Sequence, residues 1–170
     1  MPITSHPLTR TAQAALNNAK RIAEQHGQSS VDSLALLLAL LQLPKSQVAA
    51  VLKFLKVRVD NLAARVSATI KLEAQQAGLG SEAKRGELVL SAESESAFNE
   101  SFAEMKDQSL GAIDDHILLL GMLRSPESKA GQILFQYAVT AEQVRENMKA
   151  LDIVPKLTPE VMTAIEAAVA

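Results

Sequence analysis

Few side chains in this sequence have the type and spacing that chemistry requires. There are three histidines, His6, His26 and His116, and none stands at the His-Glu-x-x-His spacing of a zinc site. A lone histidine seldom does acid/base work without an orienting partner, so we interpret all three as solvated. The densest cluster is Asp114-Asp115-His116. Its acidic residues either cap the helix that follows or contact a ligand, and both interpretations stand.

Other reactive or phosphate-binding patterns are equally sparse. With no cysteine, the chain can form neither disulfides nor thiolate metal sites. No glycine precedes a lysine, so there is no Walker phosphate loop. The stretch Gly78 to Ala83 fits a dinucleotide fingerprint formally, but it follows a polar helix instead of a strand, and we interpret the match as coincidence. We therefore expect no catalytic residues, no cofactor and no metal.

Composition and charge exclude further classes. A net charge of −2 provides no field to attract nucleic acid or an anionic membrane. Lys84-Arg85 has no stacking aromatics around it, which favours a solvated linker over a nucleic-acid patch. The longest apolar run, Leu34 to Leu41, is far shorter than the roughly 20 residues that span a bilayer. The first residues lack the basic and apolar regions of a signal peptide, so we expect a cytoplasmic protein.

The helices that would position these side chains are predicted to occur as two copies of one pattern. Shifted by 82 residues without a gap, Leu36 to Leu41 falls on Leu118 to Leu123, and Pro44 falls on Pro126. The hydroxyl residues Thr9 and Ser91 also coincide. Matched prolines and helix-start hydroxyls are harder to obtain by chance than leucines. We predict an all-α fold of two tandem, pseudo-symmetric four-helix repeats, about eight helices, plus a short C-terminal helix.

Each repeat has the same helical pattern. In the first, apolar positions at i, i+3, i+4 and i+7 predict helices over about 9–26, through the leucine run, over about 46–55, and from about Asp60. In the second, Ser91 is expected to cap the first helix, Ser125-Pro126 to start the third, and Thr140 to Gln143 to form a capping box for the fourth.

The predicted boundaries follow from glycine and proline. We assign repeat one to residues 1–75, a linker to 76–87, repeat two to 88–151, and a C-terminal extension to 152–170. The linker contains Gly78, Gly80 and Gly86 among charged residues and is expected to be mobile. In the extension, Thr158-Pro159 opens the short helix, with Val161, Ile165, Ala168 and Val169 on one face.

Two sequence features, each present in both repeats, resemble those of a known family. A Leu-Thr or Leu-Ser helix start precedes an Ala/Leu amphipathic helix, and a Leu-Leu-Leu-(Ala/Gly)-(Leu/Met)-Leu helix follows. The pair resembles the double repeat at the amino terminus of Clp-type ATP-dependent unfoldases and disaggregases, over about Leu8 to Leu151. The resemblance implies a non-catalytic domain on a flexible tether that docks client polypeptides or adaptor proteins for a chaperone or protease ring.

The chain departs from the family where many members carry Thr-Glu-His before the leucine run. Ser33-Leu34-Ala35 and Asp115-His116-Ile117 stand there, so the glutamate is absent from both copies. In the branch that accepts arginine-phosphorylated clients, the resemblance implies a helix-start hydroxyl for the phosphate and this glutamate for the guanidinium. We therefore expect weak phosphoarginine binding, with docking near Leu34 and the junction of the repeats. The candidate client- or adaptor-binding residues are Thr9, Ser33, Leu34, Ser91, Asp115 and His116.

The alternatives are a free-standing accessory subunit that contacts Clp ATPase or protease subunits, a structural helical scaffold that only oligomerises, and a small helical enzyme. The enzyme alternative requires a convergent polar cluster in a pocket, and the sequence offers none.

Overall fold

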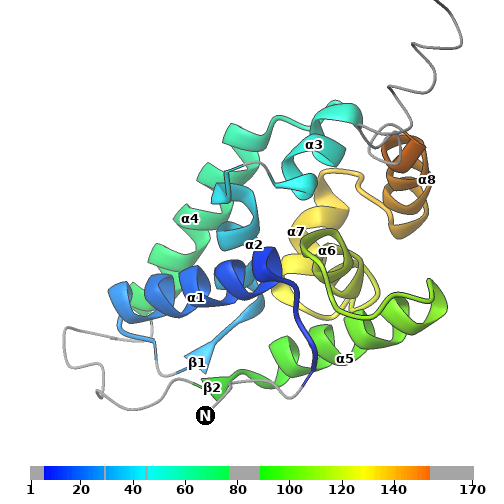
Figure 1. The fold of residues 1–170 in the computed structure, drawn as a ribbon. Coiled ribbons are helices and arrows are strands. Elements are labelled where there is room, and N and C mark those ends of the chain that lie inside the picture. Colours follow the sequence, from blue (N-terminus) through cyan, green and yellow to red (C-terminus); the bar gives the residue numbers. More distant parts are fainter. Residues whose placement is uncertain (1–5, 29, 45, 77–88, 154–170) are drawn as a thin grey trace, which may run out of the picture.

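The computed structural model describes residues 6–28, 30–44, 46–76 and 89–153, which form eight α-helices and two short strands (Figure 1). The first repeat contains α1 (Arg10–Gln25), β1 (Ser30–Val31), α2 (Ser33–Gln42), α3 (Gln47–Phe54) and α4 (Val59–Gln76). The second contains β2 (Val89–Leu90), α5 (Ala92–Asp107), α6 (Asp115–Leu123), α7 (Lys129–Gln136) and α8 (Ala141–Ile153). The prediction of an all-α fold with two four-helix repeats is confirmed. The linker residues after Gln76 and the expected C-terminal helix lie outside the described residues.

Hydroxyl side chains start most of the helices, as expected. Thr9 accepts a hydrogen bond from Ala12 N–H at the start of α1, and Ser91 accepts one from Ser94 N–H at the start of α5. Thr140 and Gln143 exchange two hydrogen bonds at the start of α8, as a capping box does.

The predicted start of the third helix in repeat two is wrong. α7 begins three residues later than expected, with Ser128 as its N-cap. The Ser125 hydroxyl is buried and has no hydrogen-bond partner in the part of the chain that the structure describes, while the Ser125 carbonyl accepts bonds from Ser128 N–H and Oγ. The chain makes one tight turn at Pro126 before the helix begins.

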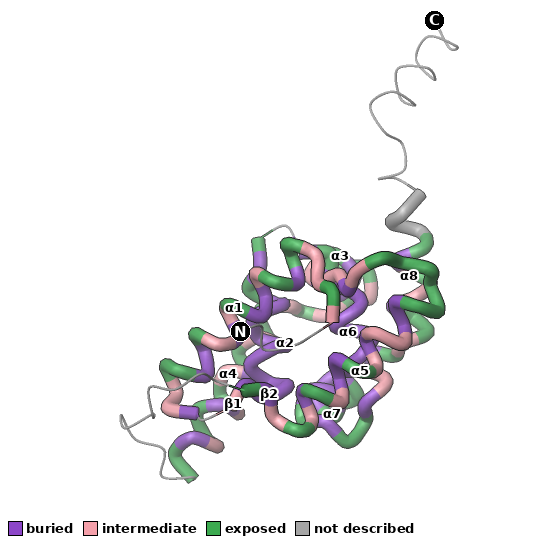
Figure 2. Tube along the Cα trace, turned by 60° about the horizontal axis from the view of Figure 1, so that its bottom comes forward, coloured by how far each residue is buried: buried purple, intermediate pink, exposed green. Residues whose placement is uncertain are grey.

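The core is built around the two leucine-rich helices. Every residue from Ser33 to Leu41 is buried, and so is every residue from Asp115 to Met122 (Figure 2). α1 packs on α2 as α5 packs on α6, and each of these outer helices also contacts the central helix of the other repeat. The two repeats therefore share one hydrophobic core.

Short strand contacts, which the sequence analysis did not predict, join the repeats reciprocally. Val31 of β1 pairs in parallel with Leu90 of β2, and Leu8 pairs in parallel with Ile113. In the 82-residue register, Leu8 matches Leu90 and Val31 matches Ile113. Thr9 N–H donates to the Ile113 carbonyl at 3.0 Å, and Ser91 N–H donates to the Val31 carbonyl at 3.0 Å. These paired bonds show that the repeats are related by a pseudo-two-fold axis.

Left-handed backbone residues follow the same symmetry. Gly27 and Ser109, which match in the register, have φ of 68° and 57° after α1 and α5. Lys56 and Ala138, which also match, have φ of 62° and 60° after α3 and α7. Such residues terminate helices by letting the following N–H groups reach the last carbonyls. The two repeats thus end their helices by the same device even where the side chains differ.

No single described helix is both long and apolar enough to cross a membrane. α2 and α3 reach the required length and composition only when taken together, and they are bent by 86° at the break between them.

Candidate functional site

The six candidate residues gather in two places where a repeat contacts the start of the other's central helix. Thr9 lies beside the start of α6, with Asp115 and His116. Ser91 lies beside the start of α2, with Ser33 and Leu34. Thr9 and Ser91 are partly exposed, whereas the other four are buried. Leu34 is 0% exposed, so its own side chain is not available to a docked protein. Its position on an all-apolar helix places it in the core.

Both helix-start hydroxyls are engaged. The Thr9 hydroxyl donates to Asp114 Oδ1 at 2.9 Å while it accepts from Ala12 N–H. The Ser91 hydroxyl donates to Ser94 Oγ at 3.1 Å. The Thr9 hydroxyl proton is therefore already directed at an acidic group of the other repeat.

At the first junction, Asp115 connects the two repeats. Its Oδ2 accepts from Gln47 N–H at 2.8 Å and from Ser46 Oγ at 3.1 Å, so a side chain of α6 caps α3 of the other repeat. Its Oδ1 accepts from His116 N–H at 2.8 Å. Burial alone would raise the pKa of Asp115, but the neighbouring His116 imidazole and the N–H bonds from Gln47 and His116 outweigh burial and lower it. The carboxylate is therefore held in its charged form.

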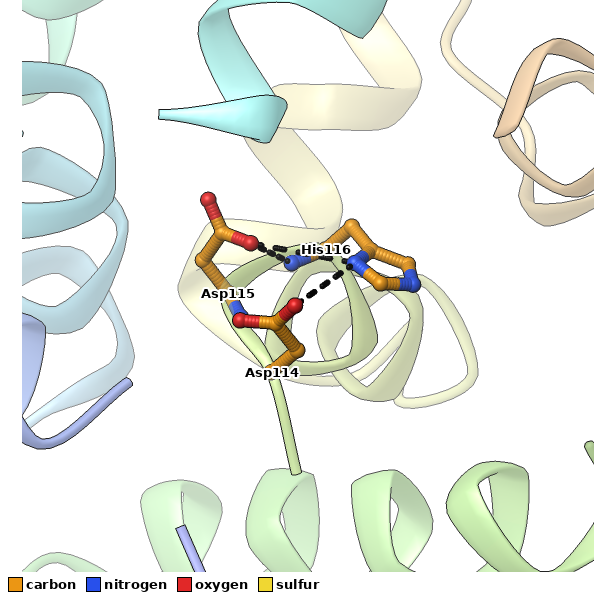
Figure 3. Close-up of side chains that lie close together, drawn as sticks. All are labelled: Asp114, Asp115 and His116. Atoms are coloured by element: carbon orange, nitrogen blue, oxygen red, sulfur yellow. Dashed lines mark hydrogen bonds and ion pairs between the residues drawn. The ribbon is translucent and has the colours of Figure 1, made fainter. Parts of the chain in front are cut away.

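Asp114, Asp115 and His116 converge at the start of α6 (Figure 3). His116 Nδ1 lies 3.8 Å from Asp114 Oδ2 and 3.7 Å from Asp115 Oδ1. Each carboxylate oxygen accepts at least one hydrogen bond from the protein: Asp114 Oδ1 from Thr9 and Asp115 N–H, Asp114 Oδ2 from Gln47 Nε2, and both oxygens of Asp115 as given above. Asp114 caps α6, as the capping interpretation expects, whereas Asp115 caps α3 of the other repeat.

The interpretation of His116 as a solvated side chain is wrong. His116 is 9% exposed, and its Nδ1 is buried without a hydrogen-bond partner among the described residues. The imidazole is buried because α6 is covered on all sides, including at its first turn, by the rest of the two repeats. His26, unlike His116, has a hydrogen-bond partner for its Nδ1, which lies 2.8 Å from the Ile22 carbonyl oxygen at the end of α1.

At the second junction the acidic group comes from Glu93, in the first turn of α5. Glu93 Oε1 accepts from Ser33 Oγ at 2.9 Å, and Oε2 accepts from Lys129 N–H at 2.9 Å. Ser33 Oγ in turn accepts from Ala130 N–H at 3.0 Å. Glu93 matches Thr11 in the register, so the internal repeat gave no signal for this role. This carboxylate lies where α2 and α7 begin.

Asp32 completes the second junction. It caps α2 by accepting from Ala35 N–H at 2.9 Å, and Lys129 Nζ lies 3.6 Å from its Oδ2. Burial raises the pKa of Asp32, and the Ala35 hydrogen bond and the Lys129 charge offset this only in part. Lys129 also bonds Glu73 of α4 at 2.9 Å, so a salt bridge links α7 to α4.

A second ionic cluster is confined to repeat two. Glu104 of α5 is 3% exposed, and both its oxygens accept from Arg145 Nε of α8, at 3.1 and 3.2 Å. Gln108 Nε2 donates to it at 2.9 Å, and Arg124 Nη1 lies 3.4 Å away. Burial would raise the pKa of Glu104, but these donors lower it. Repeat one has Ile22, Gln42 and Ala63 at the positions of Glu104, Arg124 and Arg145, so it lacks the charges of this cluster.

Two phenylalanines contrast with this buried network. The chain contains four Phe and one Tyr, and Phe54 and Phe135 are 61% and 80% exposed. Phe54 is the last residue of α3, and Phe135 is the next to last of α7, so they occupy symmetry-related corners. Leu72, Val89 and Leu110 are also exposed.

Comparison with solved structures shows the same fold in several proteins. A structure from a study of a malarial protein secretion system has a TM-score of 0.70 at 20% identity, covering 91% of this chain and 99% of that one. The Hsp104 N-terminal domain from Candida albicans has a TM-score of 0.66 at 16% identity, covering 82% and 87%. A structure from a study of the ATPase ClpV, the TssB–TssC sheath and the accessory protein HsiE of type VI secretion has a TM-score of 0.65 at 20% identity, covering 84% and 87%. At these identities the likeness shows the fold.

Comparison with curated protein sequences gives no match. The family model of the Clp repeat (R) N-terminal domain matches residues 7–137, which include α1 to α7 and both strand contacts between the repeats. The reciprocal pairing of two four-helix units and the family match agree, and the chain belongs to the Clp repeat (R) N-terminal domain family.

Proposed function

We propose that this chain docks client polypeptides or adaptor proteins for a Clp-type ATP-dependent chaperone or protease and performs no chemistry of its own. The family is one of non-catalytic N-terminal domains associated with Clp-type ATPases. The observation that carries the proposal is the exposure of Phe54 and Phe135. Aromatic side chains are enriched at protein interfaces, where a few of them contribute most of the binding free energy.

The candidate residues divide between two roles in this proposal. Thr9 and Ser91 are partly exposed at the two junctions, where they can contact a docked protein. Ser33, Leu34, Asp115 and His116 are buried and act indirectly, by holding the two repeats in one arrangement. The relative position of the Phe54 and Phe135 corners depends on that arrangement, since each corner belongs to a different repeat.

The test compares variants of the full chain in binding a labelled, permanently unfolded apolar client. Phe54→Ser with Phe135→Ser should weaken binding about tenfold or more, because truncation of an aromatic anchor typically removes at least about 1 kcal/mol. Leu72→Ser with Leu110→Ser is the matched control, since it also removes two exposed apolar side chains. Equal losses in both variants, or no binding by the wild type, would contradict the proposal.

A further inference from the structure

The corner that contains Phe54 is also basic. Lys53, Lys56 and Arg58 lie within six residues of one another around the end of α3 and the start of α4, and all three are exposed. None of them forms an ion pair with a residue that the structure describes. By contrast, three cations of repeat two, Arg124, Lys129 and Arg145, are paired with carboxylates. The three cations of this corner are therefore available to a partner.

The corner is hollowed as well as charged. A pocket of about 550 Å³ lies there, lined by Lys53, Val57, Arg58, Val59, Asp60 and Asn61. Its volume is within the range of ligand-binding pockets. Val57 and Val59 provide apolar surface, and Phe54 lies on the same turn of chain. Asp60 is the one carboxylate that lines the pocket. Together with the three cations Lys53, Lys56 and Arg58, it gives the corner a net charge of about +2.

The symmetry-related corner of repeat two provides an internal comparison. Phe135, Ala138 and Thr140 stand at the positions of Lys53, Lys56 and Arg58. Thr140 caps α8 by accepting from Gln143 N–H at 3.2 Å. Arg58 cannot accept such a bond, so repeat one has a cation where repeat two has a stabilising helix cap. The two corners have the same backbone conformation, and each has an exposed phenylalanine. The three cations belong only to the corner of repeat one.

We infer that the α3–α4 corner, formed by Lys53, Phe54, Lys56 and Arg58, docks an acidic, partly apolar peptide segment of a partner protein. This inference rests on the proposed function and specifies the chemistry of what is docked. Glutamate or aspartate side chains pair with the three cations, and an adjacent apolar side chain contacts Phe54 and the valines of the pocket. A protein segment is favoured over a nucleic acid because the chain as a whole carries −2, and a polyanion that extended past this small corner would be repelled.

The experiment measures fluorescence anisotropy of a short labelled peptide of alternating Glu and Leu, with a Gln-and-Leu peptide of equal length for comparison. The Glu peptide should bind more tightly, and its affinity should fall as salt is added. Lys53→Glu with Arg58→Glu should lower the affinity about tenfold or more, and Lys53→Gln with Arg58→Gln should lower it less. The control is Arg21→Glu with Lys71→Glu, which changes the net charge equally at exposed positions outside the corner and should change the affinity less than about twofold.

The possible results separate this inference from the proposed function. Equal binding of the two peptides, or an equal loss in the control variant, overturns the acidic-segment inference. Tighter binding of labelled oligothymidine, lost in the Lys53→Glu and Arg58→Glu variant, overturns it in favour of nucleic acid. If the unfolded client still binds through Phe54 while the Glu peptide does not, only the inference fails. If neither binds, the proposed function fails as well.

Discussion

Ser33 and Asp115 occupy equivalent positions in the two repeats, and each accepts a backbone hydrogen bond from the start of the other repeat's third helix. Ser33 Oγ accepts from Ala130 N–H at 3.0 Å, and Asp115 Oδ2 accepts from Gln47 N–H at 2.8 Å. The first residue of each central helix thus satisfies N–H groups that the opposite helix leaves open. These bonds make the helix caps part of the contact between repeats.

Replacing Asp115 by alanine should destabilise the whole domain. The change leaves Ser46 Oγ and the N–H groups of Gln47 and His116 without their acceptor, and a buried unsatisfied donor costs about 1–3 kcal/mol. We expect Asp115→Asn, which keeps one acceptor oxygen, to lose less. Urea unfolding followed by circular dichroism measures both. Equal stability of Asp115→Ala and wild type would show that the cap is not structural.

Stability should fall in acid through Asp115 and Glu104. Both carboxyl groups have a pKa below the ordinary values of 3.8 and 4.5. A lowered pKa in the folded state means that the ionised group stabilises the fold above its ordinary pKa, and that this contribution is lost as the pH falls through the folded pKa. Glu104→Gln should therefore narrow the stability difference between pH 7 and acid. An unchanged pH profile in that variant would contradict the assignment.

An acidic residue in either central helix should unfold the domain. Leu37 and Leu119 are equivalent, and both are 0% exposed. Leu37→Asp or Leu119→Asp places a carboxylate without a partner in the shared core, which costs several kcal/mol against a total stability of about 5–15 kcal/mol. Thermal denaturation checks this expectation, with exposed Leu72→Asp as the control. A small shift in melting temperature for the core variants would mean that these helices are not central.

Repeat one has apolar residues at the positions of Glu104 and Arg145, and these can replace the ion pair of repeat two. Arg145→Ala alone leaves a buried carboxylate short of its main partner and should destabilise the domain by about 1–3 kcal/mol. Glu104→Ile with Arg145→Ala reproduces the Ile22 and Ala63 of repeat one and should restore most of the loss, because apolar replacements of buried ion pairs are often neutral. Chemical denaturation of both variants compares them. A double variant no better than Arg145→Ala would show that the apolar packing does not transfer.

Phosphoarginine should bind weakly or not at all. The guanidinium would lack the carboxylate that Leu34 and His116 replace, and a charge-assisted bond of this kind contributes about 1.5–3 kcal/mol, or one to two orders of magnitude in affinity. The phosphate would also face Asp114, which already accepts the Thr9 hydroxyl bond. Calorimetric titration with free phosphoarginine tests this, and the unfolded apolar client is the comparison. Micromolar binding that disappears in Thr9→Ala would contradict it.

The helices were predictable because the 82-residue register and the apolar spacing carry the same information twice. That register also contained the correct start of α7, since Ser128 matches Ser46, but Pro126 suggested an earlier one. The strand contacts were not predictable, because each involves one or two residues far apart in sequence. No local pattern marks so short a strand.

The sequence placed the candidate residues at helix starts but did not show which of them are buried. The cap of α6 by Asp114 follows from its position before a leucine run, whereas the cap of α3 by Asp115 depends on the other repeat. The burial of His116 and the role of Glu93 depend on what the other repeat places against them, which spacing within one repeat does not reveal. Likewise, the pocket at the basic α3–α4 corner depends on how α3 and α4 are placed, which the spacing of Lys53, Lys56 and Arg58 does not reveal.

The bridges of Leu8 with Ile113 and of Val31 with Leu90 have the pattern of a contact between identical subunits. Each half offers one strand edge and receives the corresponding edge of the other, as the two partners of an isologous dimer do. A chain with a single repeat would complete this contact only with a second molecule, and its folding would depend on concentration. Here both partners are covalently joined, so the equivalent of subunit assembly is intramolecular. The two halves are then free to diverge, and the cations at one corner and the helix cap at the other are such a divergence.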